Sequence, residues 1–215
     1  MKKCQVAGMS QSGSTLLFNI VRLILKKSKT EYELTKSHEP HIHSDFYIVS
    51  LRDIRDTTAS YYLKYSHCWL SAVESAQKNI GWVKQCEALA AGVHPDAPGE
   101  KKKALFYKYE DYQADKFKQI TKLISFLGLD KFSDAEIREL IFEAEGIIWN
   151  APSQLADNNQ NYLRNEFYKE TLMLKEHRTK NKGKVGGYKD HLSRNQGRAL
   201  LEMFSGWMHQ YGYKV

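Results

Sequence analysis

Residues 8–15, with the sequence GMSQSGST, are small and polar in an order that suits the binding of a phosphate group. They follow a short apolar run, Cys4 to Ala7, and precede an apolar stretch with polar interruptions, Leu16 to Leu25. Between a strand and a helix, glycines let the backbone approach an anion closely, and successive N–H groups point at it. The N-terminus of the helix adds partial positive charge. This pattern predicts a phosphate-binding loop, and a purely structural turn is the alternative interpretation.

The two glycines of this loop have the spacing Gly-x4-Gly, which is also found in the loop of nucleoside triphosphatases. In those enzymes a lysine directly after the second glycine reaches the outer phosphates of the triphosphate. Here Ser14 takes that position. The loop therefore predicts phosphate binding without triphosphate chemistry.

Polar residues also follow three other apolar runs, and further ones gather near the C-terminus. They are Lys36-Ser37-His38, the segment from Arg52 to Tyr62, Tyr109-Glu110-Asp111, and the segment from Asn181 to His191. In a parallel sheet, ligands bind outside the carboxyl ends of the strands. The loops after Gly8, Thr35, Leu51 and Tyr109 are therefore expected to lie side by side.

Four runs rich in β-branched and aromatic residues predict strands, namely Cys4–Gly8, Tyr32–Thr35, Phe46–Leu51 and Ala104–Tyr109. Helical patterns intervene, so we expect an α/β fold of three layers with a central parallel sheet of about four to five strands. Predicted helices after the first cover Asp56–Tyr65, Val73–Leu89, Phe117–Leu127, Ala135–Glu145 and Ser193–Tyr211, and Ser133 to Glu136 is a capping box. The length suits a single domain, residues 1–215.

The net charge of +7 and the pI of about 9.1 favour an anionic partner. The recognisable interleaving of aromatic and basic residues found in nucleic-acid-binding proteins is missing, so we expect no nucleic-acid partner. The sequence has no signal-peptide pattern and no apolar run that could span a bilayer. Its three cysteines are widely spaced, which favours a reducing compartment. We therefore expect a cytoplasmic protein without a membrane partner.

Taken together, the motifs resemble those of the sulfotransferases that use 3′-phosphoadenosine 5′-phosphosulfate (PAPS). The resemblance covers the chain from end to end, with gaps at 66–103 and 145–175, and the motifs stand in the family's order. It implies a P-loop-like fold and transfer of a sulfuryl group from PAPS to a hydroxyl or amine of a small-molecule or glycan acceptor. The other product would be 3′-phosphoadenosine 5′-phosphate (PAP). This in-line displacement requires no metal.

The resemblance also implies a role for each motif. His38 would be the general base that takes the acceptor's proton, and Lys36 would stabilise the sulfuryl group. The residues that would bind the nucleotide are Gln11, Ser12, Gly13, Ser14 and Thr15 at its 5′ side, Arg52 and Ser60 at its 3′-phosphate, Tyr109 at the adenine, and Lys182 and Gly183 in a loop that closes over the 3′-phosphate.

Gln11 departs from the family, which usually has Lys or Arg at this position, beside the bridging oxygen and the 5′-phosphate. Glutamine donates a hydrogen bond but brings no charge. The loss in transition-state stabilisation would be about 2–4 kcal/mol if no other cation replaces it. Candidates for that replacement are Arg55, Lys36 and Arg178.

Two further departures concern the nucleotide. Asn181 stands where an arginine often precedes the Lys-Gly pair, and Leu16 stands where some members carry an aromatic residue that stacks on adenine. Both imply weaker nucleotide binding than in the family's detoxifying members.

Several motif residues also have simpler interpretations. His38, His41 and His43 form a histidine-rich segment, but their spacing fits no standard metal site. Arg52 and Asp53 would make an ion pair at a strand end without any ligand. Glu110 and Asp111 are expected to cap the next helix, and Trp69, Trp82, Trp149 and Trp207 are expected mainly in the core.

Three alternatives to sulfuryl transfer stay open. A phosphoadenosine-binding protein with weakened catalysis is suggested by Gln11. A small nucleotide-dependent phosphotransferase is disfavoured by Ser14, and a nucleic-acid-binding module is suggested by the basic charge alone. The sequence leaves the acceptor and the oligomeric state open.

Overall fold

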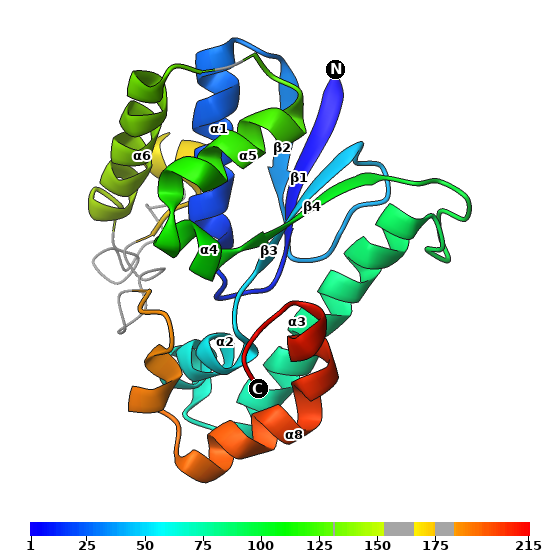
Figure 1. Cartoon of the computed structure of the whole chain (residues 1–215), viewed down its shortest axis with the longest axis vertical. Coiled ribbons are helices and arrows are strands. Elements are labelled where there is room, and N and C mark those ends of the chain that lie inside the picture. Colours follow the sequence, from blue (N-terminus) through cyan, green and yellow to red (C-terminus); the bar gives the residue numbers. More distant parts are fainter. Residues whose placement is uncertain (131, 153–165, 175–182) are drawn as a thin grey trace.

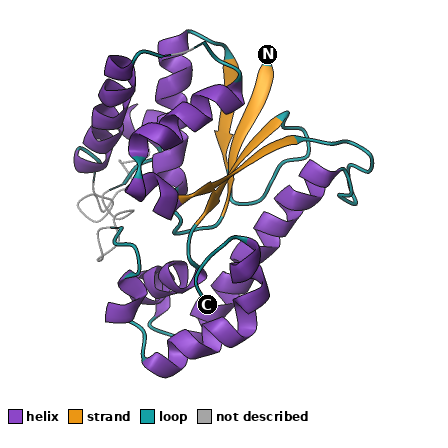
Figure 2. Cartoon of the chain, in the orientation of Figure 1, coloured by secondary structure: helices purple, strands orange, loops and turns teal. Residues whose placement is uncertain are grey.

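The computed structural model describes residues 1–130, 132–152, 166–174 and 183–215, and its centre is a parallel sheet (Figure 1). The strands are β1 (Lys2–Gly8), β2 (Tyr32–Lys36), β3 (Phe46–Leu51) and β4 (Lys103–Lys108), in the order β2-β1-β3-β4. Helices cover both faces of the sheet (Figure 2). The predicted three-layer α/β fold is confirmed, with each of the four predicted strands in place.

The helices are α1 (Ser14–Ser28), α2 (Ile54–Tyr61), α3 (Trp69–Ala91), α4 (Tyr109–Ala114), α5 (Lys116–Leu127), α6 (Asp134–Trp149), α7 (Glu166–Thr171) and α8 (Arg194–Gln210), with a π-helical turn η1 (Tyr62–Ser66) and a 3-10 turn η4 (Gly187–Asp190). The helix predicted at Asp56–Tyr65 is therefore α2 followed by a π-helical turn. The capping box is confirmed, because Glu136 N–H donates to Ser133 Oγ at 3.3 Å and Ser133 N–H donates to Glu136 Oε2 at 2.8 Å.

The layers follow from the alternation of side chains along the central strands. Ile48 of β3 belongs to a buried cluster with residues of α1, α5 and α6, whereas Val49 and Leu51 belong to one with residues of α3 and α8. These two groups of helices lie on opposite faces of the sheet (Figure 1). Both central strands are thus buried on two faces, which explains their nearly continuous apolar sequences. Of the tryptophans, Trp207 of α8 is buried, but Trp149 is 69% exposed, so its expected place in the core is wrong.

The strand order determines where a ligand has room. The chain passes from β1 to β2 on one side of β1, and β3 lies on its other side, so the carboxyl ends of β1 and β3 form the switch point of the sheet. Residues 8–13 and Arg52 follow these two strand ends directly.

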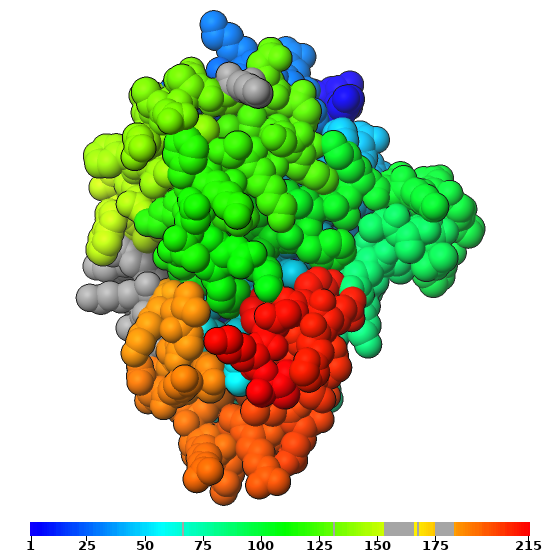
Figure 3. Space-filling view, viewed as in Figure 1, coloured from blue at the N-terminus to red at the C-terminus, as the bar shows by residue number. Residues whose placement is uncertain are grey.

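The C-terminal residues 211–215 return from α8 toward α2 (Figure 1). The side chain of Tyr213 is buried and stacks on Trp207, with ring centroids 5.7 Å apart. In the space-filling view, little of α2 shows between the upper, green part and the orange and red C-terminal segments (Figure 3).

None of the helices in the described residues combines the length and the apolar composition that a membrane span requires.

Gly8 is where β1 turns into the phosphate-binding loop. Its φ is 100°, and its N–H donates to the carbonyl of His38 at 3.1 Å. A Cβ at this position would lie 2.6 Å from the carbonyl oxygen of Ser50 in β3. Only glycine therefore allows the loop to begin this close to β3.

Gly8→Ala should destabilise the protein by roughly 3 kcal/mol or more, because left-handed strain adds to a clash with backbone. Gly99→Ala is the matched control, since Gly99 has a φ of 80° but a Cβ added there would meet no atom within 4 Å. Its cost should be about 1–2 kcal/mol, from strain alone. Urea unfolding measures both, and equal losses would contradict the close approach of Gly8 to β3.

Candidate functional site

The loop between β1 and α1 is held by hydrogen bonds to β3 and within the loop itself. Met9 N–H donates to the carbonyl of Ser50 at 3.0 Å, and Ser12 Oγ donates to the carbonyl of Met9 at 2.5 Å. Gln11 and Gly13 have φ values of 59° and 81°, both in the left-handed region. The hydroxyl of Ser12 is therefore part of the loop's internal bonding, and its backbone N–H is the group left for a ligand.

The N-terminus of α1 is open toward this loop. Its N-cap residue, Gly13, offers no side chain, and the N–H groups of Gln11 to Thr15 find no partner outside the helix among the described residues. Such unpaired N–H groups and the helix dipole together form an anion site. The loop thus has the open N–H groups that phosphate binding would need, with Ser14 and Thr15 in the first helical turn.

His38 follows β2 and is tied to Gly8 in both directions. Its Nδ1 lies 3.2 Å from the Gly8 carbonyl oxygen, and its own carbonyl accepts the Gly8 N–H. Because the carbonyl only accepts, Nδ1 carries the proton, and Nε2 keeps a lone pair. Burial and, to a smaller extent, the positive charge of Lys36 lower the pKa of His38 to about 4. The imidazole is therefore neutral at pH 7 and able to accept a proton.

Lys36 is the last residue of β2 and is partly buried. Burial lowers its pKa, and its ammonium forms no ion pair or hydrogen bond with another residue in the described part of the chain. A partly buried, unpaired cation beside His38 is suited to an anionic ligand.

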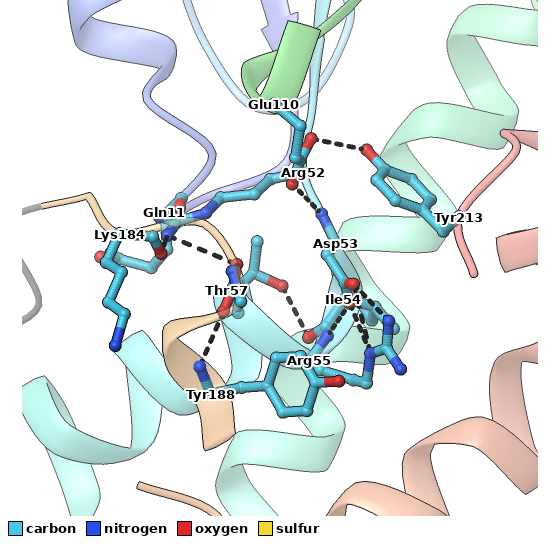
Figure 4. Close-up of polar contacts among 12 residues, drawn as sticks. Gln11, Arg52, Asp53, Ile54, Arg55, Thr57, Glu110, Lys184, Tyr188 and Tyr213 are labelled. Carbon is cyan, nitrogen blue, oxygen red and sulfur yellow. Dashed lines mark hydrogen bonds and ion pairs between the residues drawn. The ribbon is translucent and has the colours of Figure 1, made fainter. Parts of the chain in front are cut away.

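Arg55 is held by an ion pair with a neighbouring residue. Its guanidinium binds Asp53, with Nε–Oδ1 and Nη2–Oδ2 distances of 2.9 and 2.6 Å (Figure 4). It also donates to the carbonyl of Lys214 at 2.9 Å. Of the three candidates for the cation that Gln11 lacks, Arg55 is therefore already paired with a carboxylate. Arg178, another candidate to replace the charge missing at Gln11, lies outside the described residues.

Arg52 connects the loop with the C-terminal region. Its Nη1 donates to the carbonyl of Gln11 at 3.2 Å and its Nη2 to that of Lys184 at 3.1 Å (Figure 4). Its nearest carboxylate is Asp56, at 3.8 Å, so the predicted strand-end pair with Asp53 is not the one that forms.

Arg52 and Ser60 each have a buried polar atom with unused bonding capacity. In the described part of the chain, five such side-chain atoms lack a hydrogen-bond partner, and two of them are Arg52 Nε and Ser60 Oγ; the others belong to Tyr107, Tyr112 and Trp207. Asp56 and Ser60 are four residues apart and so share one face of α2, and Arg52, two residues before the helix, lies 3.8 Å from Asp56. Unpaired buried polar groups are costly, which makes this face a candidate ligand site.

Asp56 attaches the C-terminal loop to that face. The carboxylate is 1% exposed and accepts the N–H groups of Gly186 and Tyr188, each at 2.8 Å. Burial raises the pKa of Asp56, while Arg52 and the two N–H donors oppose that shift. The sequence motifs assigned Asp56 no role. Its position, four residues after Arg52 and four before Ser60, was a signal that the three side chains could lie together. Lys182, predicted to act from this loop, lies outside the described residues.

Tyr109 is the point where three motifs meet. Its ring lies under the guanidinium of Arg52, 4.8 Å from the ring centroid. A Cβ on Gly13 would lie 2.9 Å from Tyr109 Cδ2, and a Cβ on Gly183 would collide with its hydroxyl. The structure thus brings together the phosphate-binding loop, the start of α2 and the C-terminal loop, as the sequence motifs predicted.

Glu110 has a different role from the predicted helix cap. Its Oε1 accepts the N–H of Asp53 at 2.8 Å, and its Oε2 accepts the hydroxyl of Tyr213 at 3.3 Å (Figure 4). It therefore fixes the turn after β3 and the C-terminal residues.

The segment after His38 is held by Gln5 of β1, which is buried and accepts the N–H of His41 at 2.8 Å. Neither this contact nor those of Glu110 had a sequence signal.

Comparison with known proteins adds a family match to this geometry. A family model described as the sulfotransferase domain matches residues 46–212. The match begins with β3, so it includes Arg52, Ser60 and Tyr109 but neither residues 8–15 nor His38. No curated protein sequence matches the chain significantly.

Solved structures share the fold over nearly the whole chain. A retinol dehydratase in complex with androsterone and inactive cofactor PAP has a TM-score of 0.62 at 17% identity, covering 97% of this chain and 81% of that one. A mouse sulfotransferase, SULT7A1, complexed with PAP has a TM-score of 0.58 at 16% identity, with coverages of 97% and 85%. At these identities the likeness establishes the fold alone.

Asp56→Ala should release the C-terminal loop. Because two N–H groups lose their acceptor, their opening free energy should fall by about 1–3 kcal/mol, which corresponds to a roughly five- to 150-fold loss of hydrogen-exchange protection at Gly186 and Tyr188. Asp56→Asn keeps an acceptor oxygen and should lose less. Asp190→Ala, on the same loop, removes an exposed pair with Lys184 and should change protection little. Equal effects of the two alanine variants would contradict the role of Asp56.

Proposed function

The chain belongs to the sulfotransferase family, and on that premise we propose that it transfers a sulfuryl group from PAPS to a hydroxyl or amine of a small-molecule or glycan acceptor. The observation that carries the choice of donor is the buried pair of unpartnered atoms, Arg52 Nε and Ser60 Oγ. They supply a second anion site beside the phosphate-binding loop. A nucleotide with phosphate groups at both its 5′ and 3′ positions needs two such sites.

In this proposal, the N–H groups of residues 11–15 bind the 5′ side of PAPS, and Arg52 with Ser60 binds the 3′-phosphate. Tyr109, under Arg52, contacts the adenine, and Lys182-Gly183 closes over the 3′-phosphate. The presence of PAP in the two similar structures supports this choice of nucleotide. The androsterone bound in the retinol dehydratase structure supports a small-molecule acceptor as one option.

The reaction would be an in-line displacement. The acceptor oxygen or nitrogen forms a bond to sulfur while the bond from sulfur to the bridging oxygen breaks, and PAP leaves with the bonding electrons. His38 Nε2 takes the acceptor's proton, and Lys36, whose charge already acts on His38, stabilises charge on the sulfuryl oxygens. A bound nucleotide adds negative charge near the imidazole, which raises the pKa of His38 above about 4 and makes it a stronger base.

Gln11 favours a second candidate, a phosphoadenosine-binding protein with weakened catalysis. A panel of alcohols, phenols, sugars and amines tested with radiolabelled PAPS separates the two. Transfer to any acceptor supports the enzyme, whereas tight PAP binding without any transfer supports the second candidate.

The first functional prediction concerns the 3′-phosphate. PAP should bind at least about tenfold more tightly than AMP, because one charge-assisted hydrogen bond contributes roughly 1.5–3 kcal/mol. Arg52→Ala should remove most of this difference, while Arg198→Ala, which breaks an exposed pair with Glu202, should preserve it. Calorimetric titration measures each affinity, and equal affinities of the wild type for PAP and AMP would refute PAPS as the donor.

The second concerns the base. His38→Ala should lower the transfer rate by about a hundredfold or more while PAP affinity stays within about twofold. His41→Ala and His43→Ala, both at exposed positions of the same segment, should change the rate little. Single-turnover assays measure this, and similar losses in all three variants, or inhibition by a chelator, would contradict His38 as a metal-independent base.

A further inference from the structure

Two side chains of α3 reach the candidate site without a role in the reaction described above. Asn79 and Trp82 are three positions apart and therefore share one face of the helix. Asn79 is 2% exposed, and its Oδ1 accepts the N–H of Ser10 in the phosphate-binding loop at 2.8 Å. The indole of Trp82 stacks on the imidazole of His38, with ring centroids 5.3 Å apart and planes at 20°.

These contacts constrain His38 in two independent ways. The bond from Nδ1 to the Gly8 carbonyl selects the tautomer, and the stacked indole fixes the plane of the ring. Aromatic pairs of this kind contribute about 0.5–1.5 kcal/mol beyond the area they bury. The Nε2 edge of the imidazole is left for the acceptor.

We propose that Trp82 is a positioning residue for His38 and that Asn79 is a positioning residue for the phosphate-binding loop. One face of α3 thereby sets the separation between the proton acceptor and the bound nucleotide. The proposal rests on the proposed function, because that function makes His38 the base. Neither side chain touches the reacting atoms, so both act through the residues they hold.

The surroundings of His38 give the proposal a measurable signature. Burial is the largest cause that lowers its pKa, the charge of Lys36 on β2 is the second, and the Gly8 carbonyl on β1 opposes both. From α3, the neighbour is the uncharged indole, which keeps water from one face of the ring. Removing the indole should therefore raise the pKa of His38, because hydration favours the charged imidazolium.

The test is an NMR titration of the His38 ring in the full chain. In Trp82→Ala the pKa should rise by roughly one or more from about 4, toward the ordinary value of 6.5. Trp82→Phe keeps a stacked ring and should stay close to the wild type. Trp69→Ala, at the start of the same helix, removes an indole that has no stacking contact with His38 and should leave the pKa unchanged. An unchanged pKa in Trp82→Ala, or an equal rise in Trp69→Ala, would overturn the role of Trp82.

Kinetics and binding complete the test. Trp82→Ala should lower kcat at least about tenfold with KM for PAPS within about twofold, and Trp82→Phe should restore most of kcat. Asn79→Ala should weaken PAP binding at least about fivefold and leave the pKa of His38 unchanged. Unchanged PAP binding in Asn79→Ala would overturn the role of Asn79, and so would a shifted pKa of His38. If the wild type sulfates no acceptor, the proposed function fails, yet the titration and the PAP measurements still decide whether α3 positions His38 and the loop.

Discussion

The site depends on one buried cation. Arg52 is 3% exposed, so its guanidinium has given up nearly all of its water and must be compensated by the protein. Asp56 supplies the opposite charge, the carbonyls of Gln11 and Lys184 accept two of its N–H groups, and the ring of Tyr109 covers it. Three segments far apart in the sequence, at Gln11, Tyr109 and Lys184, are thus held against one side chain, because each of them lowers the cost of burying its charge.

The same constraint explains why a carboxylate is tolerable on the face proposed for the 3′-phosphate. Asp56 is opposed by Arg52 and accepts two N–H groups, so its negative charge is directed at the C-terminal loop and the guanidinium. The atoms that remain unpaired, Arg52 Nε and Ser60 Oγ, are both donors suited to an anion. A ligand phosphate would complete the bonding of this face without displacing Asp56 from its loop.

The sequence was sufficient for the fold and for the meeting of the motifs. Apolar β-branched runs alternating with helical patterns require a parallel sheet, and its carboxyl edge must gather His38, Arg52 and the phosphate-binding loop. It was not sufficient for contacts that depend on how helices dock. Trp82 reaches His38 only because α3 crosses the sheet at one particular place, and nothing in the spacing of residues 66–103 encodes that place. The pairing of Arg55 with Asp53 likewise depends on the rotamers of both side chains, which the sequence does not determine.

Two of the three departures from the family, Gln11 and Leu16, precede the part of the chain that the family model matches. That match begins with β3 and includes Arg52 and Ser60, whereas residues 8–15 and Lys36 to His38 precede it. In the proposed reaction, the leaving group's charge would normally meet a cation at position 11, and here it meets the neutral Gln11. Lys36 is partly buried without an ion pair in the described part of the chain, an arrangement that costs stability unless an anion arrives. The N-terminus of α1 adds fixed partial positive charge beside residues 11–13. Because only interactions that strengthen in the transition state accelerate the chemical step, Lys36 and the α1 N-terminus are the groups on which this chain's catalysis would have to depend.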